Sequence, residues 1–183
     1  MMTKNPRDLT TPTTSDPVGF GSSLAPLRFY IANRPPIDHY PQLDRLQMLA
    51  PGEIAHIVAN TSNHWRKAFN VCAKLLYAWH TRLAHPELPA SWQAYRDQEL
   101  FRNTRGGALL FSPPDLAAPS CWHIVFGKTW ASQLSLPALH WHDAFFATAS
   151  NCRVIVSPYP DYRQLTNERI DRLIELLVAH SAH

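Results

Sequence analysis

Several features that define specialised classes of protein are scarce or missing in this chain. The sequence has only three cysteines, Cys72, Cys121 and Cys152, which are widely spaced and typical of thiols in a reducing compartment rather than of a disulfide framework. No apolar run reaches the length of a membrane span, and the N-terminus lacks the apolar core of a secretory signal. These absences predict a cytoplasmic protein without a membrane partner.

Charge of either sign is also sparse. The 17 Lys and Arg residues and 14 Asp and Glu residues leave a formal net charge of only +3. A dedicated DNA-binding protein usually has dense Lys/Arg patches, so this balance permits an anionic partner without requiring one. With 183 residues and 45% hydrophobic content, we expect a packed globular chain with one domain.

The common catalytic motifs are missing. The chain has no Gly-x-Ser-x-Gly elbow. Gly127-Lys128-Thr129 follows a predicted strand, as in a phosphate-binding loop, but Trp122 occupies the place of the earlier glycine that this motif requires. We therefore interpret the segment as a simple turn, in which Lys128 can still face a ligand.

The cysteine and histidine pairs indicate neither a nucleophile nor a metal site. Cys121 and His123 are only two residues apart, and an inert thiol is the expected interpretation. His140 and His142 would share one face of a strand, but no further ligand has the spacing of a zinc site. We interpret them as ordinary histidines and expect no metal and no cofactor.

Four short apolar segments predict β-strands that alternate with amphipathic helices. The strands are expected at residues 27–32, 108–111, 122–126 and 153–156, and the helices from 51, from 61–63 to 83, from 91, at 128–134 and from 166 to 179. This pattern predicts an α/β fold, a single three-layer α/β/α domain with a mainly parallel four-stranded sheet over residues 24–183. Residues 1–23, rich in Thr, Pro and Ser, are predicted to form a flexible N-terminal arm.

Polar and aromatic side chains follow these strands. If the strands are parallel, the loops after them converge at one edge of the sheet, where α/β proteins usually bind ligands. Tyrosine can stack on a base, Arg and Lys can bind phosphate, and Asn and Gln can hydrogen-bond a base edge. The candidate ligand-binding residues are Asn33, Arg34, Ser112, Lys128, Ser157, Tyr159, Asp161, Tyr162, Arg163 and Gln164. The alternative is that prolines stiffen these turns and the arginines pair with nearby Asp.

Two further functions remain open from the residues alone. A hydrolase or glycosidase-like enzyme could use Asp161 or Asp38 as base or nucleophile. An interaction module could bury a partner or a second copy of the chain with its six tryptophans and the aromatic face of its longest helix. The sequence assigns no catalytic residue and no oligomeric state.

The segments that follow the predicted strands also carry a family resemblance. The first strand runs into Ile31-Ala32-Asn33-Arg34-Pro35-Pro36, the second contains Leu109-Leu110-Phe111-Ser112, and the last runs into Ser157-Pro158-Tyr159-Pro160. This succession resembles the uracil-DNA glycosylase superfamily, which has Gly-Gln-Asp-Pro-Tyr, Leu-Leu-Leu-Asn and His-Pro-Ser-Pro in these places. The resemblance spans most of residues 27–180 and implies a glycosylase-like α/β fold.

The departures from the family pattern fall on its chemistry. Arg34 stands in the place of the water-activating Asp, Ser112 in that of the base-reading Asn, and Ser157 in that of the His that stabilises the leaving anion. A cationic Arg cannot orient water as a carboxylate does. The resemblance therefore implies a domain that binds a nucleobase, nucleotide or nucleic acid without standard uracil excision.

Overall fold

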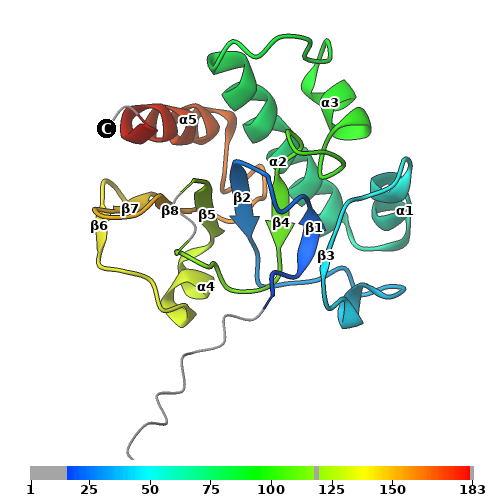
Figure 1. Cartoon of the computed structure of the whole chain (residues 1–183), viewed down its shortest axis with the longest axis horizontal. Helices are drawn as coiled ribbons and strands as arrows, with labels where there is room; N and C mark the ends of the chain where they lie inside the picture. The colour runs from blue at the N-terminus through cyan, green and yellow to red at the C-terminus, as the bar shows by residue number, and fades with distance from the viewer. Residues whose placement is uncertain (1–15, 118–119, 182–183) are drawn as a thin grey trace, which may run out of the picture.

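A mixed β-sheet runs through the centre of the chain in the computed structural model (Figure 1), which describes residues 16–117 and 120–181. In these residues eight strands are joined in the order β3-β1-β4-β2-β5-β8-β7-β6. The strands are β1 (Gly19–Gly21), β2 (Leu27–Tyr30), β3 (Leu46–Gln47), β4 (Ala108–Leu110), β5 (Trp122–Phe126), β6 (Leu139–Trp141), β7 (Ala147–Ala149) and β8 (Val154–Ser157). The helices are α1 (Glu53–Asn60), α2 (Asn63–Arg82), α3 (Trp92–Gln98), α4 (Lys128–Gln133) and α5 (Asn167–Ser181), with one 3-10 turn at Tyr40–Gln42.

The expected α/β class is confirmed, but the prediction of a four-stranded sheet is wrong. The four predicted strands are β2, β4, β5 and β8, and they form the parallel centre of the sheet. The sheet continues beyond them because β1 pairs antiparallel with β4 and β7 pairs antiparallel with β8. The added strands have only two or three residues each, too few to show the alternation that identifies a strand from sequence.

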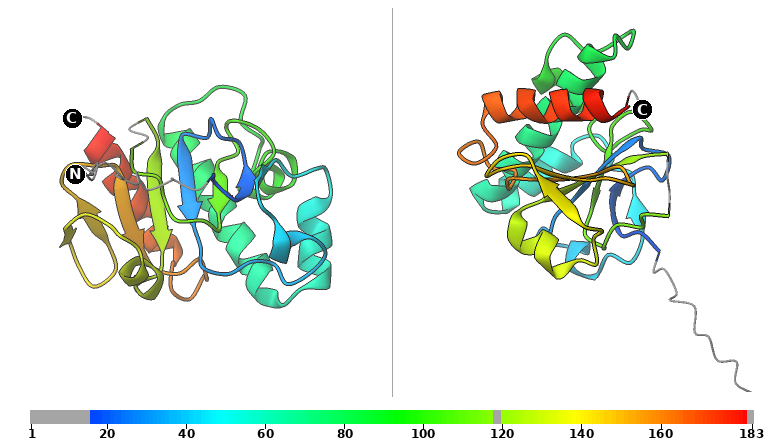
Figure 2. Two further views of the ribbon diagram at one scale, coloured as in Figure 1. Left: turned by 60° about the horizontal axis from the view of Figure 1, so that its bottom comes forward. Right: turned by 90° about the vertical axis from the view of Figure 1, so that its left-hand side faces the viewer.

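One face of the sheet carries most of the core. Phe29, Leu109 and Ile124 point from the central strands into a layer formed by α2 and α5, which lie on the same side of the sheet (Figures 1 and 2). The predicted apolar face of α2 is buried here, including Trp65 and Trp79. The aromatic face of this helix is therefore core rather than a docking surface. No helix in the described parts of the chain is both long and apolar enough to cross a membrane.

The opposite face has a thinner cover. The short helix α4 and the chain that follows it pack there on Tyr30, Val125 and Val156 through Ala131 and Trp130. Figure 2 shows α4 and α5 on opposite sides of the sheet. Because α4 begins directly after β5, this thin layer lies beside the carboxyl ends of the parallel strands.

The predicted arm over residues 1–23 needs a correction at its C-terminal end. Residues 1–15 lie outside the described residues, but Gly19–Gly21 forms β1 and Phe20 is fully buried. Gly21 has φ +116°, and a Cβ there would lie 2.5 Å from the carbonyl oxygen of Gly107. Glycine thus allows β1 to pair closely with β4, although a Gly-Phe-Gly segment has no strand signature in the sequence.

Candidate functional site

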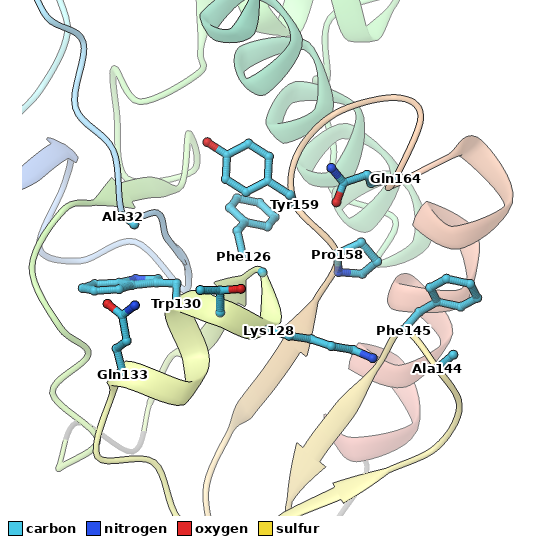
Figure 3. A pocket seen from close by; sticks show the side chains of 12 residues that line it. Ala32, Phe126, Lys128, Trp130, Gln133, Ala144, Phe145, Pro158, Tyr159 and Gln164 are labelled. Atoms are coloured by element: carbon cyan, nitrogen blue, oxygen red, sulfur yellow. The ribbon is translucent and has the colours of Figure 1, made fainter.

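The order of the parallel strands changes direction between β2 and β5. From β2 the chain moves to β4 on one side, and it then crosses to β5 and β8 on the other side. In open α/β sheets, ligands bind in the crevice outside the carboxyl ends of the strands at such a point. A cavity of about 510 Å³ lies there, lined by residues that end or follow β2, β5 and β8 and by the loop between β6 and β7 (Figure 3).

The walls of this cavity combine four aromatic side chains with four polar ones. The aromatic residues are Phe126, Trp130, Phe145 and Tyr159, and the polar ones are Lys128, Thr129, Gln133 and Gln164. Figure 3 shows Trp130 and Gln133 on α4, facing Tyr159 and Gln164 on the loop after β8. None of the described residues that line the cavity is acidic.

Lys128 provides the cationic group of the cavity. Its side chain extends toward Ala144 and Phe145 (Figure 3), and its Nζ lies 4.6 Å from the centre of the Trp141 ring. An aromatic face attracts an ammonium group but, unlike a carboxylate, does not neutralise its charge. Lys128 therefore leaves a positive charge at the cavity that an anionic group of a ligand can approach.

Tyr159 is fixed by two side chains from distant parts of the chain. The Asn33 amide donates to its hydroxyl oxygen at 3.2 Å, and the hydroxyl lies 2.8 Å from Nε2 of His64 at the start of α2. The rings of His64 and Tyr159 stack with their centroids 5.3 Å apart. Burial raises the pKa of Tyr159 to about 12 and lowers the pKa of His64, so both groups are held in their neutral forms at pH 7.

Gly127 makes the turn from β5 into α4 possible. Its φ is +91°, a left-handed conformation that L side chains rarely adopt. Its amide donates to the carbonyl oxygen of Ser157 at 2.8 Å, which continues the pairing of β5 with β8. The chain can then turn sharply and place Lys128 and Trp130 at the cavity.

The loop after β8 divides the predicted residues into two groups. Tyr159 and Gln164 line the cavity, whereas Asp161, Tyr162 and Arg163 are not part of its lining. Asp161 closes the loop, since its Oδ1 accepts from the Arg163 amide at 2.9 Å and its Oδ2 lies 3.3 Å from Lys67 Nζ. The Arg163 amide, and after it the ammonium of Lys67, lower the pKa of Asp161. Tyr162 is 51% exposed, and Lys67 Nζ lies over its ring, 5.0 Å from the ring centre.

Three other predicted residues have structural hydrogen-bond partners. Arg34 donates from Nη1 to the carbonyl oxygens of Tyr40, Pro41 and Leu43. Ser112 accepts from the Val18 amide at 2.9 Å, and the fully buried Ser157 donates to the Pro158 carbonyl oxygen at 2.8 Å. The structure brings Lys128, Tyr159 and Gln164 together at the cavity with Asn33 behind Tyr159, whereas Arg34, Ser112 and Ser157 are not part of the lining.

Sequence patterns missed several residues of the site. Trp130 and Gln133 are three apart on α4 and so share a helix face, a signal that could have indicated them once the cavity edge was known. Phe145 lies in the 139–146 segment, whose structure the pattern left ambiguous. His64 reaches Tyr159 across 95 positions of the chain, and no local pattern indicates such a contact.

The remaining candidates lie elsewhere. Asp38 pairs with His56 at 2.7 Å on the surface beside α1. His140 and His142 lie on or beside β6 with their ring centroids 4.9 Å apart, and His142 Nε2 lies 2.7 Å from Thr148 Oγ1. Among the described residues, no group of three or more His, Cys, Asp or Glu side chains could hold a metal ion.

The fold and the cavity define an α/β domain with a candidate ligand site at the carboxyl edge of its parallel strands. Residues 18–178 match the Family of unknown function (DUF6942), and the chain belongs to this family. No curated protein and no solved structure matches the chain.

Proposed function

We propose that this chain is a glycosylase-like α/β domain that binds a nucleobase, free or as part of a nucleotide or nucleic acid, in the cavity beside β2, β5 and β8. The observation that carries the proposal is a cavity of about 510 Å³ at the strand-order switch point, with four aromatic side chains and no acidic residue in its described lining. A planar, uncharged heterocycle attached to an anionic group fits these walls best.

The side chains of the cavity supply each contact that such a ligand needs. Trp130 and Tyr159 offer ring faces on which a base can stack, as in proteins that bind single-stranded nucleic acid. Gln133 and Gln164 carry amides that can donate to and accept from a base edge. The ammonium group of Lys128 can meet a phosphate, which would make binding weaker as salt concentration rises.

The same proposal excludes uracil excision by the standard route. Arg34, which the resemblance puts in the place of the water-activating Asp, donates to three backbone carbonyl oxygens. Ser157, in the place of the His that stabilises the leaving anion, is fully buried and donates to the adjacent carbonyl. Neither residue can activate water as a carboxylate does or stabilise an anion as an imidazole does.

The hydrolase alternative has less support. Asp161 is bound by Lys67 and by the Arg163 amide, so its carboxylate closes a loop. Asp38 pairs with His56. Neither residue lines the cavity, and acid–base catalysis would need a second group that faces it.

A binding experiment tests the proposal. The panel consists of AMP, GMP, CMP, UMP and a single-stranded (dT)12 oligonucleotide, measured by quenching of tryptophan fluorescence and by calorimetry at two salt concentrations. We expect at least one member to bind, with an affinity that decreases in Lys128→Gln and is unchanged in Lys74→Gln, a matched lysine on α2 away from the cavity. A uracil-containing single strand should release no uracil. Absence of binding across the whole panel would overturn the proposal.

A further inference from the structure

One wall of the cavity is held in place from behind. The ring of Tyr159 lines the cavity, while its hydroxyl is bonded to Asn33 and His64, neither of which is part of the lining. Asn33 follows β2, His64 begins α2, and Tyr159 follows β8, so the three residues join three separate elements. The position of this wall depends on the two hydrogen bonds and on the stack of the His64 and Tyr159 rings.

The protonation of His64 determines whether this arrangement is complete. Asn33 donates its amide hydrogen to the Tyr159 oxygen, and the hydroxyl hydrogen then needs an acceptor, which is Nε2 of His64. A neutral imidazole can accept there, but an imidazolium carries hydrogen on both nitrogens and cannot. Protonation would also put a second positive charge close to Lys67.

We propose that His64 and Asn33 are positioning residues that hold Tyr159 as a stacking wall, and that protonation of His64 releases this wall and weakens nucleotide binding at acid pH. This inference rests on the proposed function of the cavity. The charged groups near His64 act in opposite directions: Asp161 favours its protonated form and Lys67 disfavours it, while burial is the largest influence and favours the neutral form. Loss of affinity is expected below pH 6.5, the ordinary pKa of a histidine.

The test compares wild type with His64→Gln between pH 7.5 and pH 5. Glutamine can accept the Tyr159 hydroxyl through its amide oxygen and does not titrate. With AMP, GMP, CMP and UMP as probes, the wild-type dissociation constant should increase by up to about tenfold per pH unit below the pKa of His64. The constant of His64→Gln should change much less. Because the nucleotide phosphate titrates in both proteins, the ratio of the two constants isolates the contribution of His64. Equal pH profiles in two folded proteins would overturn the proposal.

A second measurement requires no ligand. The Cε1 proton of His64 reports its pKa by NMR, and Tyr159→Phe removes the hydroxyl that stabilises neutral His64 while it keeps the ring. We expect the pKa of His64 to rise in Tyr159→Phe and to stay unchanged in Tyr162→Phe, the neighbouring exposed tyrosine. Nucleotide binding without this coupling would refute the positioning role and leave the proposed function intact. If no nucleotide binds, the proposed function fails. The proposed effect of His64 protonation on nucleotide affinity then fails too, even if Tyr159→Phe changes the pKa of His64.

Discussion

Replacing Arg34 tests whether this residue serves the ligand or the fold. Its Nη1 lies 3.4, 3.1 and 2.9 Å from the carbonyl oxygens of Tyr40, Pro41 and Leu43. A hydrogen bond from a charged donor contributes about 1.5–3 kcal/mol, but the bond to Pro41 is exposed and the other two are only partly buried. We expect Arg34→Met, which keeps an unbranched side chain but removes the guanidinium whose Cζ lies 5.6 Å from the centre of the Phe111 ring, to lose about 3 kcal/mol of unfolding free energy. In a chain of this size that corresponds to roughly 6–12 °C in Tm.

The measurement is urea unfolding followed by circular dichroism, together with nucleotide affinity below the unfolding transition. Arg163→Met is the matched control, because its guanidinium contacts the exposed Tyr162 ring rather than backbone carbonyl oxygens. Its unfolding free energy should change by less than about 0.5 kcal/mol, as for most surface substitutions. If Arg34→Met keeps its stability and loses nucleotide binding, Arg34 is a ligand-binding residue and not a structural one.

Further predictions concern the cavity and the histidines. Trp130→Ala should weaken nucleotide binding about 5- to 150-fold, since one stacked base contributes about 1–3 kcal/mol, whereas Trp92→Ala on α3 should leave affinity unchanged. Gly127→Ala should destabilise the chain by about 1–3 kcal/mol because its backbone is left-handed, and unchanged stability would show that the turn relaxes. Burial lowers the pKa values of His64, His80 and His142. As the pH falls below 6.5, these histidines bind protons more readily in the unfolded chain than in the folded one, which favours unfolding. The free energy of unfolding, measured with urea, should therefore be lower at pH 5.5 than at pH 7.5. Equal values at the two pH values would contradict this.

The central strands could be predicted because most of their residues are apolar and buried. Val154, Ile155 and Val156 are all fully buried, as expected for a strand covered on two sides. β1, β3, β6 and β7 are short, and they exist because a neighbouring strand offers its free edge. Tertiary pairing therefore determines them, and no local sequence pattern could have indicated their number.

The same difference separates the parts of the site. Lys128, Tyr159 and Gln164 were indicated by their position after a strand, because the ends of parallel strands meet at one edge. Arg34 follows β2 and Ser157 ends β8, but strand position does not reveal whether a side chain turns toward the cavity or toward backbone carbonyl oxygens. The direction of the side chain depends on which backbone polar groups would otherwise lack a hydrogen-bond partner, such as the carbonyl oxygen of Tyr40.

The charge around the cavity favours an anionic ligand over a cationic one. Lys128 makes no ion pair with a described carboxylate, and Asp161 on the loop after β8 is already bound by Lys67. Arg169 lies 3.6 Å from the centre of the Phe145 ring, which adds a second cation beside the aromatic wall. A cationic ligand would be repelled by both charges, whereas a base that stacks on Trp130 can direct its phosphate toward them. This arrangement favours a nucleotide over a free base, so removing the phosphate from the ligand should reduce affinity and most of its salt dependence together.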